Sequence, residues 1–210
     1  GEDRTRQAMA EIAVSTRKWA NLNPMAYFYD KPTTFDDYHN SKWVAWPFHL
    51  LDCCLVTDAG AAIVITTPER AKNAKNGSVK ILGAGEGHDH SGISQMPDLT
   101  SAFGRHTGPQ ALEMAGVSHS DIDLAMIYDS FTYTALVSLE NLGFCGPGEG
   151  PDFVASQRTA PGGDFPMNTN GGGLSYTHPG MYGIFTVVEA ARQLRGQAGE
   201  RQLEDCNLAV

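Results

Sequence analysis

The stretch that decides the fold is Asn168-Thr169-Asn170-Gly171-Gly172-Gly173-Leu174-Ser175-Tyr176-Thr177-His178-Pro179-Gly180-Met181-Tyr182-Gly183. Consecutive glycines permit positive φ angles and let the backbone approach a ligand closely. A helical pattern follows over residues 185–194, and the first turn of such a helix presents unpaired backbone N–H groups. A histidine in this setting can donate a hydrogen bond to a carbonyl that is becoming an oxyanion. We therefore predict a catalytic role for His178, with a structural histidine as the alternative.

On both sides of this stretch the sequence alternates between helical and strand patterns. Met9, Ile12 and Trp19 have helical spacing within residues 4–20, and an aromatic and proline-rich stretch follows over residues 25–51. We expect one further helix to start at Pro68 and three others to cover residues 108–115, 131–142 and 185–194. The expected strands cover residues 63–66, 79–83, 121–128 and 206–210. This alternation predicts an α/β fold in which a mixed sheet is layered with helices.

The composition limits the classes of function. The chain has 210 residues, 41% hydrophobic and 19% charged, as in ordinary globular proteins. A net charge of −9 argues against binding to nucleic acid through charge, although a local site for an anionic substrate can still be positive. No apolar run is long enough to span a membrane, and the N-terminus lacks a signal-peptide pattern.

The cysteines favour a reducing compartment, which we predict to be the cytoplasm. Cys53, Cys54, Cys145 and Cys206 form no Cys-x-x-Cys pair, so we expect neither a disulfide framework nor a structural zinc site. Cys53 and Cys54 lie in an apolar stretch. We interpret them as small buried residues, with a catalytic thiol as the alternative.

Three motifs, in the family's order, resemble the thiolase superfamily. Residues 168–183 are similar to the thiolase pattern Asn-x-x-Gly-Gly followed by Gly-His-Pro-x-Gly. Ile127-Tyr128-Asp129-Ser130-Phe131-Thr132 is similar to the family's Asn-Glu-Ala-Phe segment. Asp58-Ala59-Gly60-Ala61-Ala62 is similar to its Asp-Gly-Ala-Ala strand entry. We therefore interpret the chain as thiolase-like.

The resemblance implies a fold of two similar α/β halves, normally assembled as a dimer. Residues 78–210 would form most of the C-terminal half, residues 52–77 the last strand and helix of the N-terminal half, and residues 1–51 part of the excursion between them. The family's nucleophilic cysteine would belong to an upstream segment, and a later Cys-x-Gly segment would follow Val210. Cys206 precedes that place, so we do not expect it to be a catalytic acid.

Departures from the thiolase pattern point to one branch of the superfamily. Tyr128 stands where thiolases carry the asparagine that holds a catalytic water, and Asp129 replaces the glutamate. Thr177 replaces the glycine before the histidine, and a one-residue contraction brings Tyr182 near the usual small residue. Two phenols near an oxyanion histidine resemble the lipid-transfer-protein branch, close to sterol-carrier-type thiolases, whose members include aldolases of steroid side-chain degradation.

That branch implies retro-aldol cleavage of a β-hydroxyacyl-CoA to a ketone and a shorter acyl-CoA. His178 would stabilise the enolate oxygen, and Tyr128 or Tyr182 would remove the hydroxyl proton or reprotonate the carbon. Because a free phenol has a pKa of about 10, the base role requires a lowered pKa. The alternative is that both tyrosines only shape the pocket. The residues expected to bind substrate are Asn170, Gly171, Gly172, Gly173, Asp129 and Phe131.

The same resemblance implies partners and leaves rival functions open. We expect an acyl-CoA substrate, a homodimer and a small OB-fold partner associated with acyl-CoA. We expect no metal, and no cofactor beyond the coenzyme A that the substrate carries. The alternatives are a thiolase-type acyltransferase and a non-catalytic subunit that binds lipid or acyl-CoA.

Two further motifs invite other readings. Glu86-Gly87-His88-Asp89-His90 looks like a metal site with His106 downstream, but no fixed ligand set follows it. We interpret it as a mobile loop near the substrate entrance. Gly83-x-Gly85-x-Gly87 follows an expected strand but opens no helix, which excludes a dinucleotide-binding fingerprint.

Overall fold

The computed structural model describes all residues, 1–210. Its helices are α1 (Glu2–Ala20), α2 (Phe35–His39), α3 (Pro68–Ala71), α4 (Gly104–Ala115), α5 (Thr132–Leu142), α6 (Gly150–Phe153) and α7 (Gly183–Leu194). Two short strands, β1 (Trp43–Ala45) and β2 (Phe48–His49), pair antiparallel. Five 3₁₀ turns cover Leu50–Asp52, Ile93–Gln95, His119–Asp121, Ala155–Gln157 and Gly199–Arg201, and a π-helical turn covers Gly172–Tyr176.

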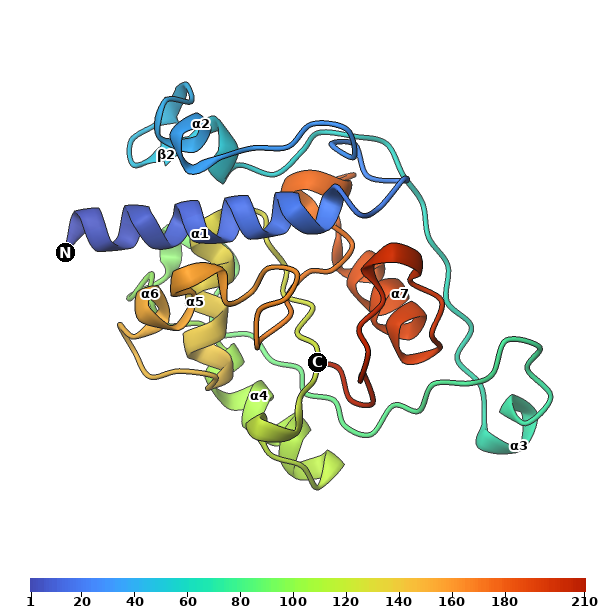
Figure 1. The fold of residues 1–210 in the computed structure, drawn as a ribbon. Helices are drawn as coiled ribbons and strands as arrows, with labels where there is room; N and C mark the ends of the chain where they lie inside the picture. The colour runs from blue at the N-terminus through green and yellow to red at the C-terminus, as the bar shows by residue number, and fades with distance from the viewer.

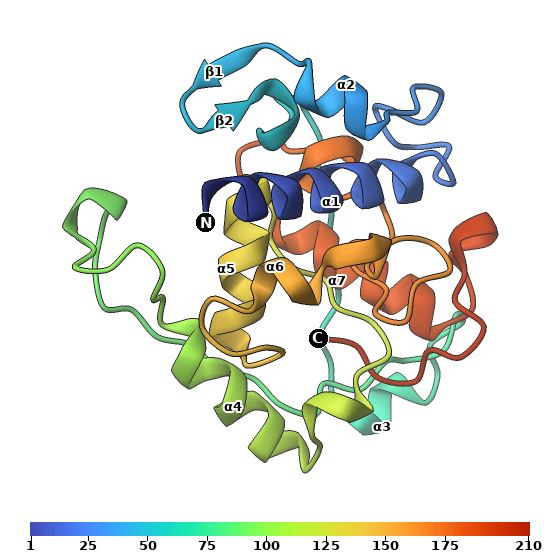
Figure 2. The ribbon, with the colours of Figure 1, turned by 60° about the vertical axis from the view of Figure 1, so that its left-hand side comes forward.

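Helix α1 lies between two groups of elements (Figures 1 and 2). The β1–β2 hairpin and α2 lie on one side of it, and α5 and α6 lie on the other. Ala8 and Ile12, four residues apart, join the larger core, whereas Met9 and Ala13 pack against Tyr38 of α2. Residues four apart share one face of a helix, so α1 presents two adjacent apolar faces. The helix predicted over residues 4–20 is confirmed.

The larger core joins α1, α5 and three extended segments. The first segment, residues 123–127, lies between residues 166–168 and residues 208–210, to which it is bonded in parallel. The Ala125 N–H donates to the Pro166 carbonyl (3.1 Å), and the Val210 N–H donates to the Leu124 carbonyl (3.0 Å). The strands expected near residues 121–128 and 206–210 are therefore present only as isolated bridges of a small parallel arrangement.

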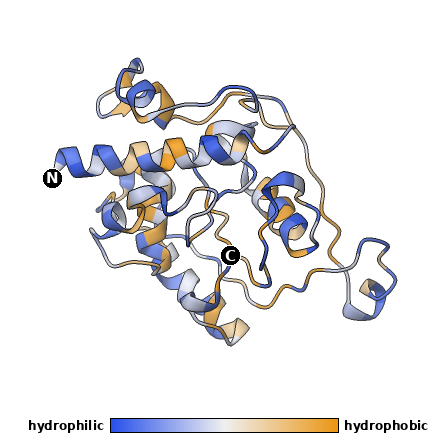
Figure 3. Cartoon of the chain, in the orientation of Figure 1, coloured by the Kyte–Doolittle hydropathy of each residue, from blue (hydrophilic) through white to orange (hydrophobic).

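The expected layered sheet does not form beyond these bridges and the hairpin. Residues 63–66 and 79–83, predicted as strands, make no backbone hydrogen bond to a neighbouring extended segment. Val64 is 91% exposed and Ile81 is 71% exposed, and Figure 3 colours much of these two segments as apolar. A strand depends on pairing and on a covered face, and neither is present here. This part of the fold prediction is wrong for the chain as it stands.

The remaining helices agree with the sequence patterns except at their ends. Helices α5 and α7 lie where they were expected, whereas α4 begins at Gly104, four residues before the expected start. Pro109 lies inside α4. Helix α3, expected after the first strand, has only four residues. No helix in the structure is both long and apolar enough to cross a membrane.

The three alternating glycines of residues 83–87, which precede α4, have a packing role. A Cβ atom at Gly83 would lie 2.0 Å from the Ala111 carbonyl oxygen, and one at Gly85 would lie 2.5 Å from the Thr107 carbonyl oxygen. Only glycine allows this close approach of a chain to a helix backbone. These glycines therefore let residues 83–87 run along α4.

Candidate functional site

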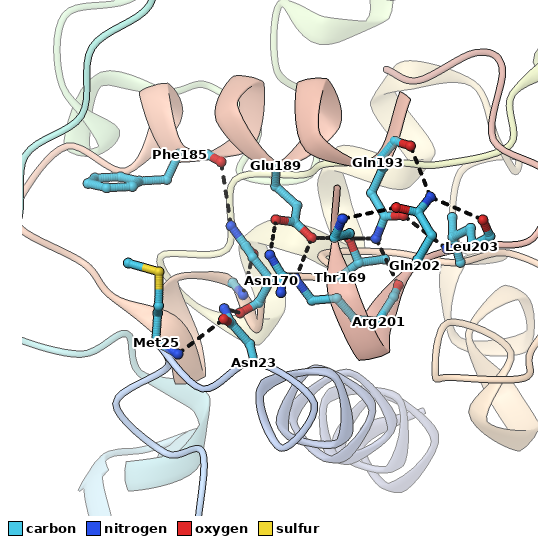
Figure 4. A network of polar contacts seen from close by, with 12 residues as sticks. Asn23, Met25, Thr169, Asn170, Phe185, Glu189, Gln193, Arg201, Gln202 and Leu203 are labelled. Carbon is cyan, nitrogen blue, oxygen red and sulfur yellow. Dashed lines mark hydrogen bonds and ion pairs between the residues drawn. The ribbon is translucent and has the colours of Figure 1, made fainter. Parts of the chain in front are cut away.

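Residues 168–170 link the end of the parallel segments to α7. Asn168 has a positive φ of 53°, and its Oδ1 accepts the backbone N–H of Ile127 at 2.8 Å. The Thr169 hydroxyl donates to Oε1 of Glu189 in α7 at 2.9 Å (Figure 4). Because both partners, Ile127 and Glu189, are buried, this segment has a fixed place at the carboxyl end of the parallel segments.

Asn170 connects the glycine loop to the start of α7. Its Oδ1 accepts the Gly172 N–H at 2.9 Å and the Tyr182 hydroxyl at 2.7 Å. Its carbonyl accepts the side-chain amide of Asn23, which follows α1, at 2.8 Å (Figure 4). Asn170 is 2% exposed, so its amide bonds with the protein and does not face an open surface.

The three glycines fit between α1 and a buried carboxylate. Gly171 has φ of 102°, and a Cβ atom there would lie 2.7 Å from the Cβ of Ala20. Gly172 has φ of 61°, and a Cβ atom there would lie 2.0 Å from Oδ2 of Asp129. The N–H of Gly173 donates to Oδ1 of Asp129 at 2.6 Å. All three glycines are buried, and their freedom is used for packing within the loop.

Asp129 supports this loop by accepting hydrogen bonds from its backbone N–H groups. Its side chain is fully buried, and burial raises its pKa to about 7, partly opposed by the N–H groups of Gly173 and Leu174. We expected Asp129 to contact substrate. In the structure its carboxylate instead faces the backbone of the loop that leads to His178.

The side chains of Tyr128 and His178 lie in contact with each other. The Tyr128 hydroxyl lies 3.0 Å from Nε2 of His178, and it accepts the backbone N–H of Tyr182 at 3.2 Å. The hydroxyl also lies 3.4 Å from the Gly180 carbonyl. Tyr128 and His178 are both half-buried, so the pair is reachable from outside. The structure thus joins two of the three predicted catalytic side chains by one hydrogen bond.

Tyr182 has a different place from the one expected of a catalytic base. Its ring is fully buried, stacks on His178 (centroids 6.4 Å apart, planes at 16°) and meets Tyr128 edge to face (5.8 Å). Burial, with the negative charge of Asp129, holds the pKa of Tyr182 well above its ordinary value. Its proton is engaged with Asn170. These contacts favour a positioning role for Tyr182, and its predicted role as a base stays a prediction.

Thr57 is a contact of the site that the sequence did not suggest. Its Oγ1 accepts the backbone N–H of His178 at 2.9 Å and lies 2.8 Å from Oγ1 of Thr177. Two residues earlier, the Leu55 N–H donates to the Gly173 carbonyl at 2.9 Å. No local pattern marks Thr57, because its partner lies more than a hundred residues away in the chain. This contact gives Thr177, noted only as a departure from the thiolase pattern, a role in holding the histidine.

Phe131 and the adjacent cysteines lie at the edge of the site. Phe131 is 39% exposed and packs on Phe48 of the hairpin, with ring centroids 5.2 Å apart. Burial raises the pKa values of the Cys53 and Cys54 thiols, and the charge of Asp129 adds to the effect at Cys54. Thiols with raised pKa values are poor nucleophiles at neutral pH, which disfavours the catalytic-thiol alternative. The two residues are half-buried, however, and not fully buried as predicted.

The histidines after the alternating glycines of residues 83–87 form no set of metal ligands. His90 lies against the carboxylate of its neighbour Asp89, and His106 contacts Arg105 and Phe103. The structure contains no group of three or more His, Cys, Asp or Glu side chains that could hold a metal ion.

Comparison with known proteins gives one family and several relatives. A family model described as thiolase C-terminal domain-like matches residues 85–210. The 17-hydroxy-3-oxo-4-pregnene-20-carboxyl-CoA lyase of Mycobacterium tuberculosis is 42% identical over 91% of this chain and 50% of the relative. A steroid side-chain-cleaving aldolase of Thermomonospora curvata is 38% identical over 98% of this chain and 54% of the relative.

A solved structure agrees with these sequence matches. The Ltp2-ChsH2(DUF35) aldolase superposes with a TM-score of 0.89 at 36% identity, over 97% of this chain and 54% of that chain. The resemblance inferred from the three motifs is therefore confirmed. The chain spans about half the length of the curated relatives it matches.

Proposed function

Because this chain belongs to the thiolase C-terminal domain-like family, we propose that the full-length protein is an acyl-CoA aldolase that cleaves a steroid side chain. The observation that carries the proposal is the hydrogen bond between Tyr128 and His178 (3.0 Å) on a loop fixed by buried contacts. Two relatives whose names describe side-chain cleavage or a carboxyl-CoA lyase, at 38–42% identity, support the same chemistry.

In the proposed reaction the Tyr128–His178 pair manages one proton and one developing charge. The tyrosine oxygen accepts the proton of the substrate's β-hydroxyl as its own hydroxyl proton passes to Nε2 of His178. The Cα–Cβ bond breaks in the same step, and the hydroxyl carbon becomes a ketone. The electron pair of that bond moves into the thioester and forms an enolate, whose oxygen the His178 ring N–H stabilises. The pair then returns this proton to the α-carbon, which completes the shorter acyl-CoA and restores both side chains. Positioned acid–base groups of this kind accelerate a reaction by about 10²–10⁴-fold.

Contacts around Tyr128 support its role as the base. The Tyr182 backbone N–H and the His178 ring both lie within hydrogen-bond distance of the phenolic oxygen. These contacts hold the phenolic oxygen in one place, which a general base requires. Tyr182, buried and bonded to Asn170, is assigned to positioning.

The other predicted site residues take supporting places in this proposal. Asn170, the three glycines and Asp129 hold the loop, because each is buried and bonded within the protein. Phe131 is partly exposed beside the hairpin and remains a candidate contact for substrate.

The proposal includes partners and a compartment. The substrate is a β-hydroxyacyl-CoA, and coenzyme A is part of it, so no further cofactor or metal is invoked. We propose a homodimer that works with a small OB-fold partner; the similar solved structure is described as an Ltp2-ChsH2(DUF35) aldolase. Four free cysteines are in keeping with a reducing cytoplasm.

Product analysis tests the reaction. The full-length protein, with its candidate partner, is given a β-hydroxy steroid-CoA, and the products are identified by mass spectrometry. We expect a ketone and a shorter acyl-CoA in equal amounts, without added free coenzyme A. If instead only a β-ketoacyl-CoA is split, and only with free coenzyme A, the protein is a thiolase-type acyltransferase. No turnover of either substrate, with binding retained, would favour a non-catalytic subunit.

A further inference from the structure

A buried ion pair lies outside the candidate site and joins α7 to the turn Gly199–Arg201. Nε of Arg201 donates to Oε1 of Glu189 at 2.8 Å, and a second guanidinium nitrogen donates to Oε2 at 2.9 Å. Their side chains are 7% and 1% exposed. A paired geometry of this kind fixes the carboxylate in direction as well as in place. Neither residue touches the Tyr128–His178 pair.

The ion pair is the centre of a network that joins three segments (Figure 4). Glu189 belongs to α7, Arg201 to the turn Gly199–Arg201, and Thr169 to the loop before the glycines. Gln193, one turn further along α7, donates to the Thr169 hydroxyl oxygen (3.1 Å) and to the Arg201 carbonyl (2.9 Å). The Thr169 hydroxyl therefore both donates to Glu189 and accepts from Gln193, which leaves it little freedom to rotate.

Thr169 is the point at which this network reaches the site. It is followed directly by Asn170, whose Oδ1 holds the Gly172 N–H and the Tyr182 hydroxyl. The backbone N–H of Tyr182 in turn donates to the hydroxyl of Tyr128. Two consecutive residues thus connect a charged anchor in the core with the donors around the reactive phenol.

We propose that Thr169, held by the Glu189–Arg201 ion pair, is a positioning residue that sets the geometry of the Tyr128–His178 pair. The role rests on the proposed function, since it concerns the rate of that reaction. An ion pair in the core is costly to desolvate and is weak evidence of stabilisation by itself. Here its carboxylate has a further use. Through its hydrogen bond with one neutral hydroxyl, it fixes the loop that contains the candidate site.

Deletion of that hydroxyl is the test, made in the full-length protein with its partner. Thr169→Val removes both hydrogen bonds and keeps the ion pair, whereas Thr169→Ser keeps the hydroxyl. We expect Thr169→Val to lower kcat about 10- to 100-fold with little change in KM, because a small misplacement of reacting groups costs up to about 100-fold. Thr169→Ser is expected to stay close to the parent in kcat. Thr169→Ala replaces the valine variant if valine prevents folding.

A second readout does not depend on activity. Hydrogen–deuterium exchange of peptides that cover residues 170–182 should be faster in Thr169→Val than in the parent, and unchanged in Thr169→Ser. Thr186→Val is the matched control, because the Thr186 hydroxyl donates only to the Gly183 carbonyl within the same helix (2.6 Å). The control should keep both kcat and the exchange of residues 170–182.

The outcomes separate this inference from the proposed function. Parent-like kcat and exchange in Thr169→Val would overturn the positioning role, and so would equal losses in the serine and valine variants. If the parent has no aldolase activity, the proposed function fails. The exchange comparison then still decides whether Thr169 fixes the loop: faster exchange only in the hydroxyl-deleting variant supports the anchor, and no difference overturns it.

Discussion

Residues 168–183 and residues 56–82 differ in how completely they are anchored, although both carry motifs of the same family. In the first region three consecutive residues bond to distant parts of the chain: Asn168 to Ile127, Thr169 to Glu189 in α7, and Asn170 to Asn23 after α1. In the second, apolar side chains point outward: Val56 is 98% exposed and Val64 is 91% exposed. A motif becomes a defined structure only where the rest of the chain supplies partners for it. The four stability predictions below test this contrast in the 210-residue chain.

The largest expected effect is loss of the buried carboxylate in the anchored region. Glu189→Ala leaves the Arg201 guanidinium in the core without its partner. We expect the free energy of unfolding to fall by about 3–5 kcal/mol, measured by chemical denaturation. Asp152→Ala, which breaks the exposed pair with Arg4, is the control and should leave stability nearly unchanged. Similar losses in the two variants would remove the distinction between buried and exposed anchors.

Asp129 should make stability depend on pH. Its pKa in the folded chain is about 7, against 3.8 ordinarily, because its carboxylate is buried. Between these values the unfolded chain gives up the proton and the folded chain keeps it. The stability that Asp129 contributes is therefore full below pH 4 and lost as pH rises through 7.

This loss is as much as about 4 kcal/mol, and Asp129→Asn should abolish it. The measurement is the difference in unfolding free energy between parent and variant from pH 4 to 8. A difference that does not change with pH would show that the carboxylate is not held in a desolvated place beneath the loop.

Gly172 tests how closely the loop approaches that carboxylate. Gly172→Ala combines a positive φ with a Cβ atom 2.0 Å from Asp129, so we expect a loss of about 2–3 kcal/mol in thermal or chemical unfolding. Gly162→Ala is the matched control, since Gly162 also has a positive φ (84°) but open space around it. It should cost about 1 kcal/mol. Equal costs would mean that backbone strain alone, and not the contact with Asp129, makes glycine necessary.

The smallest effect is expected in the exposed region. Val64→Ser removes an apolar side chain that has almost no contact, so the unfolding free energy should change by less than about 0.5 kcal/mol. A loss of 2 kcal/mol or more would contradict the contrast, because it would show that a packing partner covers this segment.

The sequence predicted the elements that depend on local order. Helices α1, α5 and α7 follow from apolar spacing, and the two-sided burial of α1 agrees with its many small residues. Residue type and motif order singled out His178 and Tyr128, which the structure places 3.0 Å apart, and their catalytic roles stay predictions. The division of the chain at residues 52 and 78 stays a prediction.

What the sequence could not predict depends on distant partners. An apolar run such as residues 63–66 is typical of a strand, but pairing needs a neighbour that the pattern does not contain. Tyr182 and Tyr128 are the same residue type on either side of one loop. Tyr182 is fully buried with its hydroxyl bonded to Asn170, whereas Tyr128 is half-buried, and no local pattern distinguishes them. The partners of Thr57 and Glu189 were likewise invisible in any local window.

The most direct test of the central claim is the rate of ketone release from a β-hydroxy steroid-CoA by Tyr128→Phe in the full-length protein. Tyr182→Phe is the matched control, because it also removes one phenolic hydroxyl. We predict that Tyr128→Phe lowers kcat by about 10³-fold and that Tyr182→Phe lowers it by no more than about 10-fold. A Tyr128→Phe variant with nearly parental kcat would contradict the account, and a large loss confined to Tyr182→Phe would reverse the two assignments.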